Sequence, residues 1–145
     1  MIRRATWEDR CDVVRLMRDF HAAVRIAPFE FSPVHVEQYF HGVLLNPDSL
    51  AIVLDVNGAA QGLLAATVVS HPWADFKVAS EIAWWIDPDH RGKGWRAMIV
   101  TYEDWAREHG AQTASLTEFA EMPVGALYRA KGYTLAESTH VKVLR

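Results

Sequence analysis

The most constraining feature of this 145-residue sequence is a strand that runs into a basic, glycine-rich loop, which then opens a helix. Residues 78–86 have the apolar character of a buried strand, and the loop ends in Arg91-Gly92-Lys93-Gly94. Backbone amides of such a loop, together with a helix N-terminus, form an anion-binding site, and glycines let phosphate oxygens approach closely. The segment therefore predicts an α/β protein that binds a phosphate-bearing molecule.

The remaining sequence predicts strands and helices on both sides of this segment. Strand-type patterns cover residues 1–5, 50–56, 59–70, 78–86 and 112–117, with one or two more strands over 133–144. Helix-type patterns cover residues 7–25, 94–109 and 123–131, and a further helix runs from residue 33 to a stop signal at 46–48. An antiparallel hairpin, followed by a strand, a crossover helix and a parallel strand, predicts a mixed α/β sheet with helices on both faces.

Local signals mark several boundaries of these elements. Pro28 is expected to end the first helix, and Ser32-Pro33 is expected to start the second, with proline at its first position. The pair Asn57-Gly58 suits a two-residue hairpin turn, which needs a positive φ at both positions.

Bulk composition limits the class of protein. The formal net charge of −3 gives no basic footprint for nucleic-acid binding. The one cysteine, Cys11, cannot form an internal disulfide, which fits a reducing cytoplasm. No apolar run reaches membrane-spanning length, and we expect the first residues not to act as a signal peptide. We therefore expect a single cytoplasmic domain over residues 1–145, with neither a nucleic-acid nor a membrane partner.

Three kinds of phosphate site could use the loop. A Walker A loop requires Ser or Thr directly after its Gly-Lys pair. Here Gly92-Lys93 is followed by Gly94 and Trp95. A dinucleotide fingerprint is formally present as Gly92-x-Gly94-x-x-Ala97, although four polar or proline residues separate it from its strand and an antiparallel hairpin precedes it. The third possibility is a cradle for the pyrophosphate of coenzyme A.

Two motifs make the third possibility specific, because together they resemble the GNAT superfamily of N-acetyltransferases. The superfamily hallmark, Arg/Gln-x-x-Gly-x-Gly/Ala after an aliphatic-Asp-Pro run, is matched by Ile86-Asp87-Pro88 and Arg91-Gly92-Lys93-Gly94-Trp95. A second family signal, on the last helix, is matched by Ala126-Leu127-Tyr128-Arg129-Ala130-Lys131-Gly132-Tyr133. Two positions depart from the pattern: Arg96 replaces the hallmark's final Gly/Ala, and Glu121 replaces an Asn that many members carry.

The resemblance implies a fold and a reaction. The fold would be the GNAT acyl-CoA N-acyltransferase fold, a mostly antiparallel sheet with a splayed parallel pair of strands. The reaction would be direct acetyl transfer from acetyl-CoA to an amine, without a covalent enzyme intermediate and without a metal. The ending of the chain, residues 137–144, also resembles small stand-alone members of the family found in bacterial and phage genomes.

The resemblance further implies roles for individual residues. Tyr128 would be the general acid for the leaving thiolate, and Glu81 would be the general base for the acceptor amine. The expected cofactor-binding residues are Trp84, Trp85, Ile86, Arg91, Gly92, Lys93, Gly94, Trp95, Arg96, Ala97 and Tyr128. The backbone of the first three would pair with the pantetheine arm, and the loop and helix residues would hold the pyrophosphate.

Several alternatives stay open at this point. His71, His35 and Glu118 are other candidate bases. The chain could instead be a catalytically weak acyl-CoA-binding or regulatory module on the same fold, or, more remotely, a nucleotide-binding protein. The first two helices and their connection should shape the acceptor side with His21, Arg25, Glu30, Phe31 and His35. That mixture identifies no acceptor, and the sequence does not decide between a monomer and a homodimer.

Overall fold

Five strands form one sheet in the order β1-β2-β3-β4-β5 in this computed structural model, which describes residues 1–25 and 29–144. The strands are β1 (Ile2–Arg4), β2 (Ser49–Val56), β3 (Ala59–Ser70), β4 (Lys77–Ile86) and β5 (Ala111–Ser115). Strands β1 to β4 pair antiparallel, whereas β4 and β5 pair parallel. This confirms the predicted mixed α/β sheet with one parallel pair.

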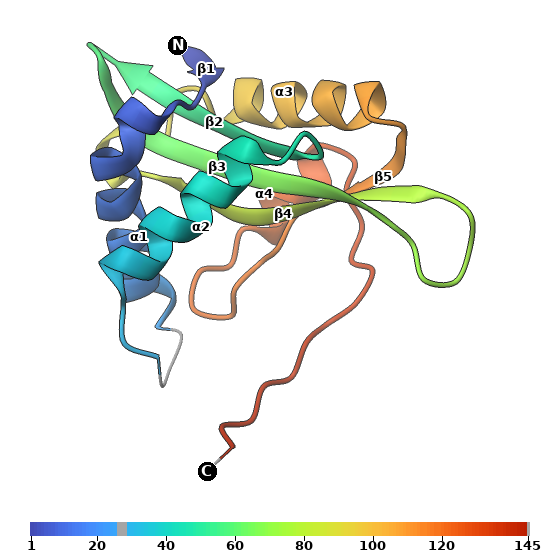
Figure 1. Cartoon of the computed structure of the whole chain (residues 1–145). Coiled ribbons are helices and arrows are strands. Elements are labelled where there is room, and N and C mark those ends of the chain that lie inside the picture. The colour runs from blue at the N-terminus through green and yellow to red at the C-terminus, as the bar shows by residue number, and fades with distance from the viewer. Residues whose placement is uncertain (26–28, 145) are drawn as a thin grey trace.

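Helices cover both faces of the sheet (Figure 1). The helices are α1 (Arg10–Val24), α2 (Pro33–Leu45), α3 (Trp95–Glu108) and α4 (Gly125–Ala130), with short 3₁₀ turns at Trp7–Asp9 and Pro88–His90. Helices α1 and α2 pack on one face and α3 packs on the other, where it forms the crossover between β4 and β5. The predicted helices are therefore present, and α4 is shorter than expected.

Two hydrophobic cores sit on the two faces of the sheet. Side chains of a strand alternate between its faces, and along β2 Ala51 and Val53 face α1 and α2 whereas Ile52 and Leu54 face α3. The α3 face also buries Tyr102, which has no exposed surface. The sheet therefore lies between the two cores, and packing on both faces keeps its strands in register.

The local boundary signals have the expected geometry where the structure describes them. Asn57 and Gly58 have φ values of 54° and 85°, as the two-residue hairpin turn between β2 and β3 requires. The hydroxyl of Ser32 accepts a hydrogen bond of 3.2 Å from the amide of His35 and so caps α2, which Pro33 begins. Pro28 lies outside the described residues.

The prediction of one or two terminal strands is wrong. Within the described part of the chain, residues 133–144 form no strand, and they run away from the sheet as an extended segment (Figure 1). Leu135 and Leu144 are almost fully exposed there. A β-type sequence pattern indicates that the side chains are compatible with a sheet, but a strand forms only when it can pair with the edge of a neighbouring strand. In this structure the segment is anchored at Tyr133 and is not paired with β5.

Candidate functional site

The parallel strands β4 and β5 separate halfway along β4. Among the described residues, β5 pairs only with residues 77–80 of β4, and the chain leaves the sheet after Ser115. Apart from Ile82, residues 81–86 of β4 still pair with β3 on their other side. The second half of β4 therefore has one edge without a strand beside it, and its peptide groups there can bind another extended molecule.

A pocket of about 180 Å³, here called the splay pocket, lies at this open edge. It is lined by Trp84, Trp85, Ile86, Arg91, Trp95, Met122, Val124, Leu127 and Tyr128. These side chains come from β4, from the loop and first turn of α3, and from the segment around α4 that follows β5. The structure thus brings six of the eleven predicted cofactor residues to one pocket.

The predicted anion loop has the backbone shape of a helix N-terminus. Gly94 has a φ of 74° and precedes α3, and its carbonyl oxygen accepts the hydrogen bond of 2.9 Å from the Met98 amide. The amides of residues 95–97 precede that bond and have no intrahelical acceptor. A Cβ at Gly94 would lie 2.7 Å from Cδ1 of Leu54, so a side chain here would displace Leu54 and would also adopt an unfavourable positive φ.

Three basic residues surround this loop. Arg91 donates from Nε to the Ile86 carbonyl oxygen at 3.1 Å, and its guanidinium lies 4.7 Å from the centre of the Trp85 ring. Arg96 lies 4.5 Å over the Trp95 ring, and Lys93 is exposed. The loop therefore combines free helix amides with positive charge at one end of the splay pocket, as an anion site requires. Gly92, Lys93, Gly94, Arg96 and Ala97 adjoin the pocket along the chain but do not line it.

Glu81 lies where the two strands begin to separate. Its Oε2 accepts a hydrogen bond of 2.9 Å from the amide of Thr117, just beyond β5. Burial raises the pKa of the Glu81 carboxyl to about 7, and the Thr117 bond opposes that rise only in part. A carboxyl group with a pKa near neutrality can both take and give a proton at physiological pH.

Tyr128 lines the splay pocket, whereas Glu81 does not. Its hydroxyl donates a hydrogen bond of 2.8 Å to the Thr117 carbonyl oxygen, and its ring stacks on Trp84 with 6.1 Å between centroids. Burial, and then the charges of Glu81 and Glu118, raise the pKa of the Tyr128 hydroxyl above its ordinary value. The phenol is therefore protonated throughout the neutral range.

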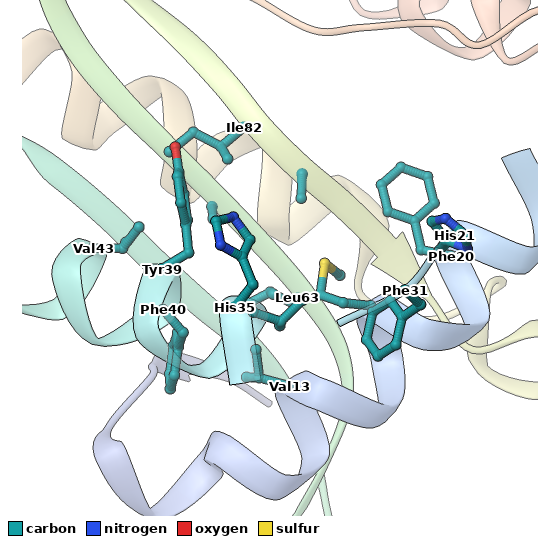
Figure 2. Close-up of a pocket in the computed structure, with 14 residues that line it drawn as sticks. Val13, Phe20, His21, Phe31, His35, Tyr39, Phe40, Val43, Leu63 and Ile82 are labelled. Atoms are coloured by element: carbon teal, nitrogen blue, oxygen red, sulfur yellow. The ribbon is translucent and has the colours of Figure 1, made fainter. Parts of the chain in front are cut away.

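A bulge in β4 turns its side chains toward a second pocket. Ala65 of β3 pairs with Ala83 and Ala66 pairs with Glu81, so Ile82 is an extra residue on β4. Ile82 and Ala83 consequently both face α1 and α2. Together with side chains from those helices they line a pocket of about 250 Å³, here called the α1–α2 pocket (Figure 2).

Of the other residues that the sequence suggested for the acceptor side or as bases, some line the α1–α2 pocket and others lie elsewhere. His21, Phe31 and His35 line the α1–α2 pocket, whereas Arg25 and Glu30 do not. His71 stacks on Phe76 in the β3–β4 loop and lines neither pocket. Glu118 accepts a hydrogen bond from the Gly125 amide at the start of α4. Cys11 is an exposed residue of α1.

Thr117 was not among the residues predicted from the sequence. Its backbone amide and carbonyl hold the two strongest acid–base candidates, and backbone contacts leave no signature in residue type. The Nε1 atom of Trp84 was also not singled out, yet it is buried at the splay pocket without a hydrogen-bond partner among the described residues. An unpaired buried donor of this kind is costly and is a natural contact for a ligand acceptor.

Two further observations concern the described residues only. They contain no group of three or more His, Cys, Asp or Glu side chains arranged to hold a metal ion. None of their helices is both long and apolar enough to span a bilayer.

Comparison with known proteins identifies the fold and the family. The model of the acetyltransferase (GNAT) family matches residues 13–133. A transcriptional regulator from Bacillus halodurans C-125 is similar in structure, with 19% identity, a TM-score of 0.83 and 99% of each chain covered. A predicted acetyltransferase with acetyl-CoA from Clostridium acetobutylicum has 16% identity and a TM-score of 0.82, covering 98% of this chain and 95% of that one. Glucosamine-6-phosphate N-acetyltransferase from Arabidopsis thaliana has 13% identity and a TM-score of 0.79, covering 100% and 98%. A search of curated proteins gave no match.

Proposed function

The chain belongs to the acetyltransferase (GNAT) family, and on that premise we propose that it transfers the acetyl group of acetyl-CoA directly to an amine. The observation that carries the proposal is the open edge of β4 at the splay pocket, with a basic helix N-terminus at one end and Tyr128 in its wall. The five-stranded sheet shared by both cores supports a single catalytic domain over residues 1–145.

The donor would bind along the open edge of β4. A pantetheine arm has two amide groups, and extended amides pair with an unpartnered strand edge as an added strand would. The backbone of Trp84, Trp85 and Ile86 supplies that edge. The pyrophosphate would then lie at the Arg91–Gly94 loop, where helix amides and positive charge favour an anion.

The acceptor amine would lose its proton toward Glu81. An amine arrives mostly as ammonium at neutral pH and cannot attack a thioester in that form. A carboxyl group whose pKa is about 7 is ionised in a large fraction of molecules at neutral pH, and it is basic enough to accept the proton directly or through water. The neutral amine nitrogen then forms a bond to the acetyl carbon, and it must lose a second proton to become the amide; that proton replaces the one that Tyr128 gives to the leaving thiolate.

Tyr128 would serve the leaving group. As the nitrogen–carbon bond forms, the carbon–sulfur bond breaks and coenzyme A leaves as a thiolate, which needs a proton. The hydroxyl of Tyr128 is protonated, lies in the wall of the splay pocket, and is the nearest match to the family's usual acid position. Positioning two bound substrates without a covalent intermediate would supply much of the acceleration.

Release of free thiol from acetyl-CoA in the presence of an amine panel tests the proposal, with mass spectrometry of the products. We expect amine-dependent thiol release and a product heavier by one acetyl group. Tight binding of acetyl-CoA without turnover on any amine would instead support an acyl-CoA-binding or regulatory module. A thermal shift with ATP or NAD but not with coenzyme A would point to a nucleotide-binding protein.

A further inference from the structure

The α1–α2 pocket is almost entirely apolar. Its walls are built from aliphatic and aromatic side chains of α1, α2, β3 and β4, including the buried Val13, Phe40 and Leu63. No Asp, Glu, Lys or Arg lines it among the residues that the structure describes. Within this described lining the pocket therefore offers mainly hydrophobic contact to a ligand, with polar groups only from His21, His35 and Tyr39.

The few polar side chains of this pocket lie toward solvent. His35 and Tyr39 are exposed residues of α2, and Figure 2 shows both extending from that helix over the cavity. His21, on α1, is engaged through Nε2 with the Phe29 carbonyl oxygen at 2.8 Å. His35 and Tyr39 thus lie on the exposed side of the pocket, and the buried part of its lining is hydrophobic.

The pocket reaches the strand on which the reaction is proposed to occur. Ile82 and Ala83 line the α1–α2 pocket, and the next three residues of β4, residues 84–86, line the splay pocket. The bulge at Ile82 lies at the level where β4 parts from β5. A molecule bound between α1 and α2 can therefore present one end to the gap between the two strands.

We propose that the acceptor is a small primary amine with an uncharged apolar body, either one aromatic ring or a short branched aliphatic group. This inference rests on the proposed function and names the substrate class for it. A cavity of about 150 Å³ with an apolar lining binds benzene, so a pocket of about 250 Å³ accommodates one ring with a short chain. A second charge in the hydrophobic interior would be buried without an Asp, Glu, Lys or Arg partner among the described residues, which is strongly unfavourable.

Binding can be tested apart from catalysis with 2-phenylethanol, which has the apolar body and lacks the amine. We expect this alcohol to raise the melting temperature of the wild-type protein. Val36 is half-buried and lines the pocket, so Val36→Phe should fill it and abolish the shift. Val34, on the same helix, is 67% exposed and does not line the pocket, so Val34→Phe is the matched control and should respond like the wild type.

Turnover completes the test with 2-phenylethylamine and its analogue bearing a ring carboxylate. We expect transfer to 2-phenylethylamine, a KM at least tenfold higher for the carboxylate analogue, and a similar rise for 2-phenylethylamine in Val36→Phe. The KM for acetyl-CoA should stay unchanged in both valine variants. A phosphorylated amino sugar and a polycationic aminoglycoside represent charged acceptors, and neither should be acetylated at a comparable rate.

The possible failures are distinguishable. Transfer to a charged amine in preference to 2-phenylethylamine would overturn this inference and leave the acetyltransferase proposal intact. If none of the amines causes thiol release, although 2-phenylethanol raises the melting temperature, the proposed reaction is overturned and with it the acceptor assignment. A dimer that Val36→Phe dissociates and Val34→Phe does not would assign the pocket to a second copy of the chain and would also overturn the inference.

Discussion

Glu81 and Tyr128 are held by the same residue: the carboxylate of Glu81 accepts a hydrogen bond from the Thr117 amide, and the hydroxyl of Tyr128 donates one to the Thr117 carbonyl oxygen. Thr117, just beyond β5, thus fixes a candidate base on β4 and a candidate acid on α4. Ionised Glu81 also disfavours a second negative charge on Tyr128, which keeps the phenol protonated. The pair is arranged so that one group can accept a proton while the other retains one.

Replacement of Glu81 by glutamine should remove the base and keep the shape. We expect kcat to fall by roughly 10²–10⁴-fold, the range for general acid–base catalysis, with acetyl-CoA affinity almost unchanged. In the wild type the rate should rise with pH through about 7, because only the ionised carboxylate accepts a proton. Glu81→Gln should lose that acidic limb. Near-normal turnover across pH would reject Glu81 as the base and direct attention to Glu118 or His35.

The same carboxyl should also be visible in the pH dependence of stability. The folded state holds a proton on Glu81 up to a pKa of about 7, whereas the unfolded state releases it near the ordinary value of 4.5. Between these values the folded state binds more protons, so the contribution of Glu81 to the free energy of unfolding falls as pH rises. Chemical denaturation from pH 4.5 to 7 should show a shallower decline in Glu81→Gln than in the wild type. Glu137→Gln, at an exposed position, should match the wild type.

Elements specified by local sequence were predictable in this chain. The hairpin turn at Asn57-Gly58, the start of α2 at Pro33 and the strand-loop-helix around Gly94 each depend on a few neighbouring residues, and each is present. A positive φ or a missing amide acts on the backbone within one turn, so residue type alone reports it. Most of the sheet followed from these units and their order.

Features that depend on distant partners were not predictable. The segment 133–144 has a strand-like pattern, but pairing depends on an available edge elsewhere in the chain, and residue type does not report that. Likewise, sequence placed both Arg25 and Phe31 near the acceptor side, and only Phe31 lines the pocket. The apolar character of that pocket arises from residues of four elements that are far apart in sequence.

Replacement of Tyr128 by phenylalanine should separate catalysis from packing. The ring and its stacking on Trp84 remain, while the hydroxyl and its bond to Thr117 are lost. We expect kcat to fall by roughly 10²-fold, the lower end for general acid–base catalysis, with acetyl-CoA affinity unchanged and a stability cost of about 1 kcal/mol for the lost hydrogen bond.

Tyr133 provides the matched control for this change. Its hydroxyl donates to Glu103 at 3.0 Å, and it does not line the splay pocket. Tyr133→Phe should therefore have a comparable effect on melting temperature and no effect on kcat. Equal rates for Tyr128→Phe and the wild type on the true acceptor would mean that the thiolate leaves without help from Tyr128.

The anion loop should be tested at Gly92, because Gly94 cannot separate binding from folding. Any side chain at Gly94 meets Leu54 and adopts an unfavourable positive φ, so a variant there loses stability whatever the loop binds. A Cβ at Gly92 meets no atom within 4 Å. Gly92→Val should keep the melting temperature and raise the Kd for acetyl-CoA about tenfold, since the branched side chain restricts the backbone that approaches the phosphates. Calorimetric titration measures the change. S-acetylpantetheine lacks the pyrophosphate and should bind the variant and the wild type equally. If Gly92→Val weakens the binding of both ligands to the same extent, or of neither ligand, the pyrophosphate does not bind at this loop.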